Sequence, residues 1–564
     1  MTVDPPSSWN RSTDIVVVGS GGAGLVAALA ARPADVLVVE KAPKIGGTTA
    51  VSGGGLWLPN SRPAVDAVGR QPPEQVEAYI RRVAGERVDD ALIETFVDLA
   101  PDVVDFIEAR TNLVFQFAGY PDYHTDWAEA SDDGNMIEPT VFDGARLGDD
   151  LDAVRDDPHH ELPVPASEVY EAGGHAKFPK VADFEKLQRR AEADKLATGR
   201  ALVAGLYEGC LDAGVRFETG TAGRELVTDG DDVVGLLAER GGEELAIEAG
   251  AVVIAAGGID WDEDMRENFL RGPVDAPMTP PSVEGDGVTI GMDVGAKLGN
   301  MNEAWWFPAS RAHGQHWEDG SPLYKMNWGR TLPGSIFVNE DGERFCNEAG
   351  NYHDLTKTLH DFDPGRYGAR NLPAYMVVDQ QFRDRYQLLA GESDDDTVGW
   401  RDQRLGADES LNEQTPDELA AGETLRELAE VLGVDPDGLE ATVEQFNEHA
   451  RRGEDPEFGR GQTAYDNFVG DPDTDHPNLG PLDEPPFYAI EVHSGIIGTK
   501  GGLVTRPDGA VLDVHEEPIP GLFAASNSTA HVMGMGYAGA GATLGPNVVF
   551  GYQAGRHARD VATE

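Results

Sequence analysis

Hydrophobic residues first gather in a short run near the N-terminus. Residues 14–19 (DIVVVG) are apolar and β-branched and end in glycine, which predicts a buried parallel strand. The small residues that follow, through Ala31, predict a helix, and the apolar run 36–40 predicts a second strand. Such a strand, helix, strand unit is typical of an α/β fold with a parallel sheet.

Longer periodic segments follow this unit. Apolar positions recur at helical spacing over residues 73–86, 89–110 and 184–213, and an acidic loop region rich in Gly and Asp covers 119–160. Short alternating runs over 215–257 are separated by the turn signals DGDD and RGGEE. These runs predict an antiparallel meander that returns to the buried sheet at the apolar segment AVVIAAGG.

The pattern changes over the next two hundred or so residues. Aromatic-rich segments, a polar acidic insert at 392–418 and two helical patterns on either side of GVDPDG occupy residues 304–497. We expect an α+β domain inserted into the first domain. After it, residues 519–527 again predict a sheet strand, and Pro546 predicts the start of a C-terminal helix, because proline is favoured in the first turn.

The turn after the first strand carries a dinucleotide-binding pattern. Gly19, Gly21 and Gly24 fit G-x-G-x-x-G, in which the glycines allow the tight turn, the close approach of a pyrophosphate and the packing of helix on sheet. Glu40 ends the second strand, where an acidic side chain can accept both ribose hydroxyls. The complete unit predicts dinucleotide binding.

Two further segments favour FAD over NAD. Residues 40–60 continue into a loop rich in Gly, Thr and Ser, which suits a flavin nucleotide along the sheet edge. Residues 541–546 (GATLGP) precede a helix whose positive N-terminal end could stabilise negative charge on reduced flavin. The residues expected to bind FAD are Gly19, Ser20, Gly21, Ala23, Gly24, Glu40, Lys41, Gly47, Thr48, Thr49, Ser52, Gly53, Asn527, Thr543 and Leu544.

From these motifs we expect two domains. A Rossmann-like FAD-binding domain with an antiparallel meander is expected to be discontinuous, over residues 1–304 and 498–564. The inserted substrate-binding and catalytic domain is expected over residues 305–497.

The charge balance excludes one class of partner and indicates an unusual environment. Lys and Arg total 44 against 100 Asp and Glu, a formal net charge of −56, which excludes nucleic acid and anionic membranes as electrostatic partners. Only 10 of the 44 cations are Lys, and this composition resembles cytosolic proteins of halophiles that accumulate salt. In molar salt the Debye length falls to about 3 Å, which screens the self-repulsion.

Cysteine usage and the absence of sorting signals favour the cytoplasm. Cys210 and Cys346 form neither a disulfide framework nor a metal-binding spacing, so a reducing compartment and no metal site are expected. The N-terminal residues show no basic and apolar signal pattern, and no apolar stretch of about 18 residues predicts a membrane span.

Several segments together resemble one flavoprotein family. GSGGAGLVAALAA, EKAPKIGGTTAVSGGGLW, GTKGGLVT, GLFAASNSTA and LGPNVVFGY are similar to the 3-ketosteroid Δ1-dehydrogenases, within the wider fumarate reductase-like superfamily. The resemblance covers residues 14 to about 557. It implies an FAD-linked removal of two hydrogens from C1 and C2, beside a 3-ketone.

The resemblance also implies four catalytic residues. In this family a tyrosine hydroxyl and a glycine amide hold the ketone oxygen, and the segment GYAGAGATLGP places them at Tyr537 and Gly541. ERFCNEAGNY places the family's base tyrosine at Tyr352, and FAGYPDYHTD places its partner tyrosine at Tyr123. A free tyrosine has a pKa near about 10, so a tyrosine base requires a partner that shares or removes its proton. Alanines at 538 and 540 stand where the family commonly has proline.

Other functions remain open at this stage. A Δ4-dehydrogenase of 5α-3-ketosteroids would hold the ketone in the same way, and another bulky cyclic ketone could replace the steroid. A fumarate reductase-like enzyme is less favoured, because residues 527–555 contain no Arg or Lys to bind a dicarboxylate. A flavin-binding protein without turnover is a further alternative. The resemblance implies a quinone or a carrier protein as electron acceptor, and the oligomeric state stays open.

Overall fold

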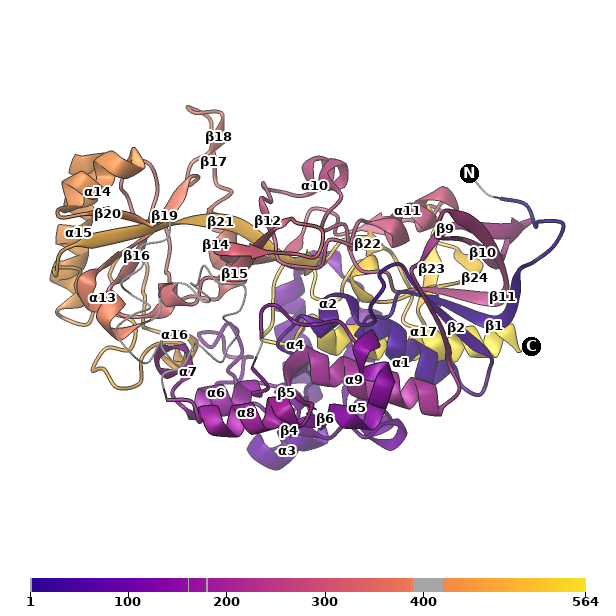
Figure 1. Ribbon diagram of the computed structural model, residues 1–564. Helices are drawn as coiled ribbons and strands as arrows, with labels where there is room; N and C mark the ends of the chain where they lie inside the picture. Colours follow the sequence, from indigo (N-terminus) through magenta and orange to yellow (C-terminus); the bar gives the residue numbers. More distant parts are fainter. Residues whose placement is uncertain (1–2, 161, 179–180, 387, 389–418, 564) are drawn as a thin grey trace.

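The computed structural model describes residues 3–160, 162–178, 181–386, 388 and 419–563. Two large sheets lie at opposite ends of an elongated molecule, with both chain termini beside the first sheet (Figure 1). A layer of helices runs along one side of the molecule (Figure 1). The predicted α/β class is confirmed.

The first sheet forms around the N-terminal unit. Six of its eight strands follow the order β23-β24-β11-β1-β2-β8; β10 pairs antiparallel with β11, and β9 pairs antiparallel with β10. The pairs β11-β1, β1-β2, β2-β8 and β11-β24 are parallel. The strands are β1 (Arg11–Val18), β2 (Val36–Glu40), β8 (Arg216–Thr219), β9 (Thr221–Asp229), β10 (Asp232–Arg240), β11 (Glu243–Ile254), β23 (Ala510–Leu512) and β24 (Pro518–Ala524).

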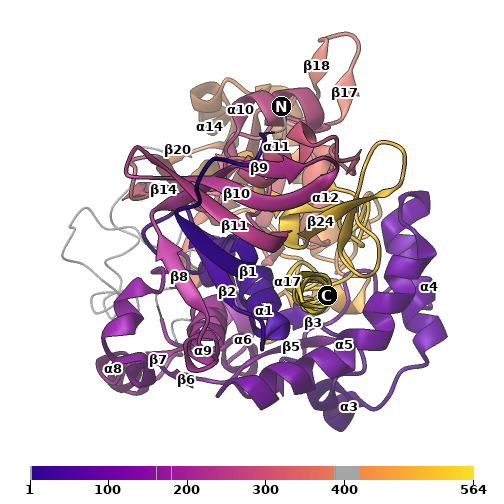
Figure 2. The same cartoon turned by 90° about the vertical axis from the view of Figure 1, so that its right-hand side faces the viewer.

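Both faces of the central strands are covered, which explains their continuous apolar sequence. Ile15 and Val17 of β1 face a core that they share with helices α1 (Gly22–Ala31) and α17 (Leu544–Ala562). Val16 and Val18 face the opposite core, beneath the β9–β11 meander. Figure 2 shows α1 and α17 on one side of this sheet and the meander on the other.

A helical region connects β2 with β8. It contains α3 (Arg62–Val68), α4 (Pro73–Ala84), α5 (Asp90–Arg110), α6 (Ala166–Glu171), α7 (Gly174–Lys177), α8 (Phe184–Glu192) and α9 (Thr198–Asp212). The helices predicted at 73–86 and 89–110 are confirmed as α4 and α5. The single helix predicted over 184–213 is wrong, because the short strand β7 (Lys195–Leu196) separates α8 from α9.

The second sheet belongs to the later part of the chain. Its main path is β15-β14-β21-β19-β16, and β12 and β20 also pair with β21. The strands are β12 (Ala276–Pro277), β14 (Ala304–His316), β15 (Pro322–Met326), β16 (Ser335–Val338), β19 (Ala374–Asp379), β20 (Ala420–Gly422) and β21 (Phe487–Thr499). The proposed boundaries at 304 and 498 remain a prediction, and β12 joins this sheet from outside them.

Helices α12 (Tyr352–Thr358), α13 (Gln380–Arg385), α14 (Leu425–Leu432), α15 (Pro436–Ala450) and α16 (Ala464–Phe468) accompany this sheet. Helices α14 and α15 confirm the two patterns around GVDPDG. The predicted acidic insert at 392–418 lies outside the described residues. The C-terminal helix begins at Leu544, two residues before the predicted Pro546. No helix in the described ranges has the length and apolar character that crossing a membrane requires.

Candidate active site

A cavity joins the glycine turn of the first sheet to a group of tyrosines. All four predicted catalytic residues line this cavity. Every predicted cofactor residue lines it too, except Gly24. Gly24 instead serves packing, since a Cβ there would lie 2.1 Å from the carbonyl oxygen of Gly19. The cavity thus brings together segments that are more than 500 residues apart in the sequence, from Gly19 to Leu544.

The predicted pyrophosphate turn has the required shape. Gly19 adopts φ +104°, and a Cβ there would lie 2.4 Å from the carbonyl oxygen of Ala255, so only glycine fits. Glu40 accepts hydrogen bonds from the amide and hydroxyl of Ser20, at 3.0 and 2.6 Å. Helix α1 begins after Gly21 with its positive N-terminal end toward the cavity, where the Thr49 hydroxyl accepts from the Gly22 amide at 2.9 Å. This glycine cradle fits the pyrophosphate of FAD.

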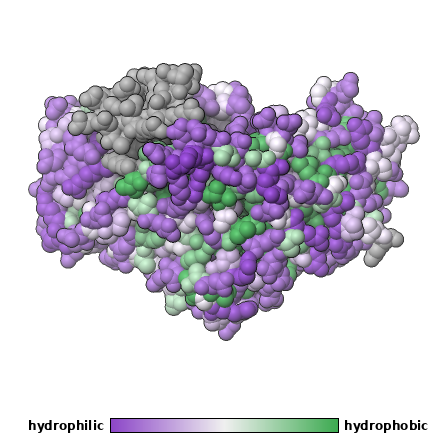
Figure 3. Space-filling model, turned by 60° about the horizontal axis from the view of Figure 1, so that its bottom comes forward, coloured by the Kyte–Doolittle hydropathy of each residue, from purple (hydrophilic) through white to green (hydrophobic). Residues whose placement is uncertain are grey.

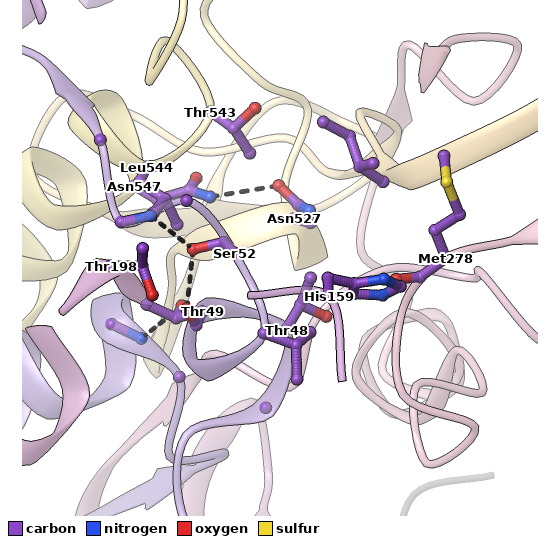
Figure 4. A pocket seen from close by; sticks show the side chains of 18 of the residues that line it. Thr48, Thr49, Ser52, His159, Thr198, Met278, Asn527, Thr543, Leu544 and Asn547 are labelled. Carbon is purple, nitrogen blue, oxygen red and sulfur yellow. Dashed lines mark hydrogen bonds between the residues drawn. The ribbon is translucent and has the colours of Figure 1, made fainter. Parts of the chain in front are cut away.

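The opposite wall of the nucleotide cavity comes from the start of α17. Asn547 in its first turn donates from Nδ2 to Oδ1 of Asn527, at 3.1 Å, and Thr543 and Leu544 lie beside them (Figure 4). Thr49 of the short helix α2 (Gly47–Ala50) and Ser52, which follows this helix, line the facing side (Figure 4). The sequence analysis missed Asn547, although it belongs to the quoted segment LGPNVVFGY.

Three separate segments bring the predicted catalytic tyrosines together. Tyr123 follows β4 (Phe115–Phe117), Tyr352 is the first residue of α12, and Tyr537 lies in the loop before α17. The ring centroids are 5.2 Å apart for Tyr123 and Tyr352, 5.1 Å for Tyr123 and Tyr537, and 5.7 Å for Tyr352 and Tyr537. All three rings are buried.

The hydroxyl groups form two distinct arrangements. The Tyr123 hydroxyl donates a short hydrogen bond to the Tyr352 hydroxyl. The Tyr537 hydroxyl instead accepts from Oγ1 of Thr543, at 2.9 Å, which leaves its own proton free to be donated. Gly541 lies at φ +86°, and its amide donates to no acceptor in the described part of the chain. Tyr537 and Gly541 therefore present two donors.

Burial makes ionisation of these tyrosines costly. It raises the pKa of Tyr123 and Tyr352 well above the ordinary value, and it also raises the pKa of Tyr537. The hydrogen bond from Tyr123 acts in the opposite direction on Tyr352. A base at Tyr352 therefore depends on groups that stabilise a negative charge.

Side chains from distant elements hold the loop that carries Tyr537. The Tyr79 hydroxyl and the Tyr123 amide both donate to the carbonyl oxygen of Ala538, at 2.6 and 2.9 Å. The buried ammonium of Lys500 donates to the carbonyl oxygen of Gly536. The first two contacts hold the loop at Ala538, one of the two alanine positions where the resembled family commonly has proline. Nothing in the sequence signalled Tyr79.

Comparison with known proteins identifies the family of the chain. The chain matches the family described as "FAD binding domain" over residues 14–544. It is 40% identical to a 4-oxocyclohexanecarboxylate 2-dehydrogenase of Sinomonas cyclohexanicum, covering 97% of this chain and 93% of that protein. It is 34% identical to a 3-oxosteroid 1-dehydrogenase of Mycobacterium tuberculosis, covering 97% and 98% of the two chains.

A solved structure is also similar over the full length. The 3-ketosteroid Δ1-dehydrogenase of Sterolibacterium denitrificans, in complex with 1,4-androstadiene-3,17-dione, superimposes with a TM-score of 0.87 at 33% identity. The match covers 98% of this chain and all of that one.

Proposed function

The chain belongs to the FAD-binding family that includes the 3-oxosteroid 1-dehydrogenases, and from this membership we propose that it desaturates a 3-ketosteroid between C1 and C2. It is an FAD-dependent oxidoreductase. The observation that carries the proposed reaction is the hydrogen-bonded pair of Tyr123 and Tyr352 beside the two donors Tyr537 and Gly541.

Each residue has a distinct part in this proposal. The Tyr537 hydroxyl and the Gly541 amide donate to the ketone oxygen and stabilise the negative charge that develops there. Tyr352, in the anionic form that it shares with Tyr123, removes the proton at C2, and the electrons of that bond move toward the ketone oxygen. FAD, when bound on the glycine cradle, supplies the acceptor for the hydride that leaves C1.

The cavity wall beside the tyrosines favours a bulky apolar substrate. Trp328 lies 5.9 Å from the Tyr352 ring, and Tyr170 lies 5.0 Å from Tyr120. The aliphatic residues Leu162, Val164 and Val169 line the same cavity. Such a surface suits the fused rings of a steroid.

A monocyclic 4-oxo acid is the second candidate, favoured by the 40% identity to the Sinomonas enzyme. A carboxylate requires a cation or several donors when it leaves water. Lys325 and Lys41 both line the cavity and carry such a charge, and Lys41 also pairs with Asp286 at 2.7 Å.

Substrate-dependent bleaching of the flavin separates these candidates. The FAD-loaded enzyme would be mixed without oxygen with saturated and Δ4 3-ketosteroids and, separately, with 4-oxocyclohexanecarboxylate. We expect faster bleaching with a steroid, and a product with its new double bond at C1–C2. A Δ4 product from a saturated steroid would indicate the alternative regiochemistry, and faster bleaching by the monocyclic acid would overturn the steroid assignment. Bleaching by none of them would contradict both candidates.

The cellular setting belongs to the same proposal. A quinone or a carrier protein would take the electrons from the reduced enzyme. The two cysteines are buried and unpaired, which supports a reducing cytoplasm, and the net charge of −56 supports a cell with high internal salt. Figure 3 shows one face of the molecule as largely hydrophilic, as a strongly charged surface would be.

A further inference from the structure

Consecutive aromatic residues of strand β14 lie against the proposed site. The Trp305 ring packs on the ring of Tyr537 at a centroid distance of 4.5 Å, and the Phe307 ring packs on that of Tyr352 at 4.0 Å. Trp305, Trp306 and Phe307 are fully buried, and β14 pairs with β21 in the second sheet. The strand therefore supports both the proposed base and the proposed ketone donor.

His353 connects this strand to the loop that carries Tyr537. It follows Tyr352 in helix α12 and is fully buried. Its Nδ1 accepts from the amide of Trp306, at 3.4 Å, and its Nε2 contacts the carbonyl oxygen of Met535, at 2.9 Å. One imidazole therefore joins the strand, the helix that begins with the base, and the loop that carries the ketone donor.

One protonation state of His353 fits both contacts. An amide N–H donates and a carbonyl oxygen accepts, so Nδ1 has to be unprotonated and Nε2 has to carry the hydrogen. Burial lowers the pKa of His353 well below its ordinary value, and the positive charge of Lys357 acts in the same direction. The side chain is therefore a neutral bridge with an acceptor at one end and a donor at the other.

Met535 is the point at which helix α12 holds the loop. Lys357, in the same helix as His353, donates to the same carbonyl oxygen of Met535. The Lys357 ammonium also pairs with the buried carboxylate of Glu303, at 3.2 Å. The amide of Met535 donates to the carbonyl oxygen of Ala84, at the end of α4, at 3.1 Å. The backbone of this residue is thus held through both its amide and its carbonyl group.

The proposed reaction needs the base and the ketone donor at a fixed separation. The proton leaves the carbon next to the carbonyl carbon, so Tyr352 and Tyr537 must reach neighbouring parts of one rigid substrate. Their ring centroids lie 5.7 Å apart, although they belong to different segments of the chain. A displacement of about 1 Å between such groups can slow a reaction by about 10²-fold.

We propose that His353 is a positioning residue that fixes the base Tyr352 relative to the ketone donor Tyr537, by bridging β14 and the carbonyl oxygen of Met535. This inference rests on the proposed function, which gives the two tyrosines their roles. His353 itself touches no substrate in this account, because among the described residues Tyr352 and Tyr537 line the cavity and His353 does not.

The test separates the two ends of the imidazole. His353→Gln keeps a donor that can reach the Met535 oxygen, whereas the shorter side chain in His353→Asn keeps only an acceptor for the Trp306 amide. Both replacements are polar and uncharged. His360→Gln is the matched control, because His360 also packs on Trp306, at a centroid distance of 4.6 Å, and its Nε2 contacts the hydroxyl of Ser494 at 2.7 Å.

The first readout is anaerobic flavin reduction by a 3-ketosteroid, with the limiting rate separated from the dissociation constant of the steroid. For His353→Asn we expect a limiting rate about tenfold lower than in the parent, because the base and the donor lose their fixed separation. The dissociation constant should stay within about twofold, since the apolar cavity wall is unchanged. His353→Gln should recover most of the rate, and His360→Gln should match the parent.

The second readout needs no substrate. Amide hydrogen exchange is measured on the FAD-loaded proteins in molar salt, over the loop 531–541 and over residues 11–31 as a reference. In His353→Asn we expect exchange in the loop to become about tenfold faster, with no change in the reference segment. The loop in His353→Gln should exchange as in the parent. If His353→Asn does not fold, His353→Met replaces it, because this variant removes both hydrogen bonds with an apolar side chain, and the same losses are expected.

The outcomes separate this inference from the proposed function. Faster loop exchange in His353→Asn, in a protein whose flavin no ketosteroid reduces, would support the bridge between helix and loop while the proposed function fails. In an active enzyme, an unchanged limiting rate in His353→Asn, or an equal loss of rate in His353→Gln or His360→Gln, would overturn the inference. Unchanged loop exchange in His353→Asn would overturn it as well.

Discussion

Single hydroxyl groups carry the chemistry proposed at the residue scale. The Tyr537 ring is buried against Trp305 at a centroid distance of 4.5 Å, so replacement by Phe keeps the packing and removes only a hydrogen-bond donor. The Thr543 hydroxyl that donates to Tyr537 would lose this acceptor. Chemical effects at this site should therefore be separable from effects on folding.

Tyr537→Phe is expected to slow flavin reduction by 10²- to 10³-fold, on the order of 3 kcal/mol, because an oxyanion donor is lost. Tyr123→Phe should cost less than removal of the base itself, since Tyr123 acts through its hydrogen bond to Tyr352. Rapid-mixing absorbance measures both rates. FAD content should match the parent, and a variant that loses its FAD would contradict the separation of the two sites.

Asp122, next to Tyr123, gives a prediction for stability against pH. It accepts from the indole of Trp57 at 2.8 Å and from the amide of Ser131 at 2.9 Å, and burial raises its pKa from 3.8 to about 7. Between these two pH values the folded state keeps a proton that the unfolded state releases. The contribution of Asp122 to the stability of the folded state is therefore greatest below about pH 4 and falls as the pH rises to about 7.

Asp122→Asn removes this titration. The thermal midpoint of the variant relative to the parent is expected to rise between pH 5 and pH 8, measured at constant salt. A difference that stays constant over this range would show that Asp122 does not titrate there.

Helix packing dominates at the element scale. Helix α17 lies against α1, and a Cβ at Gly555 would lie only 2.1 Å from the carbonyl oxygen of Ala27. Both helices begin at the FAD cavity. The distance between the two helices therefore fixes the relative positions of their N-termini at this cavity. Gly555→Ala should force the helices apart, lower stability by about 1–3 kcal/mol and weaken FAD retention. Denaturant unfolding and FAD release after dilution measure these effects; unchanged values in both would contradict this account of the packing.

Individual helices and strands differ in how well sequence patterns predict them. The unit β1-α1-β2 was predictable because turn chemistry, apolar runs and Glu40 all lie within about thirty residues. The break between α8 and α9 was not predictable from the sequence. It arises where Lys195 of β7 pairs with Asp143, a residue far away in the sequence, and a long-range pairing of this kind has no local sequence signal. The tyrosines were placed through a family resemblance, since no spacing brings residues 123, 352 and 537 together. Tyr79 has no motif and required the structure.

At the scale of the whole molecule, the net charge of −56 causes electrostatic repulsion across the surface. Many of its ion pairs are exposed, such as Arg426 with Glu440, and such pairs add little stability against this self-repulsion. Lowering the salt from molar to about 0.1 M lengthens the Debye distance from about 3 to about 10 Å and restores repulsion across the surface. We expect the thermal midpoint and the activity to fall in dilute buffer. Equal midpoints in dilute buffer and in molar KCl would contradict a halophilic adaptation.

The most direct test of the central claim is the rate of flavin reduction by a 3-ketosteroid in Tyr352→Phe. The substitution keeps the buried ring and its contact with Phe307 at 4.0 Å, but removes the group proposed to take the C2 proton. The account predicts an FAD-loaded, folded protein whose flavin is reduced more slowly than in Tyr537→Phe or Tyr123→Phe. Reduction as fast as in the parent enzyme would show that another group is the base.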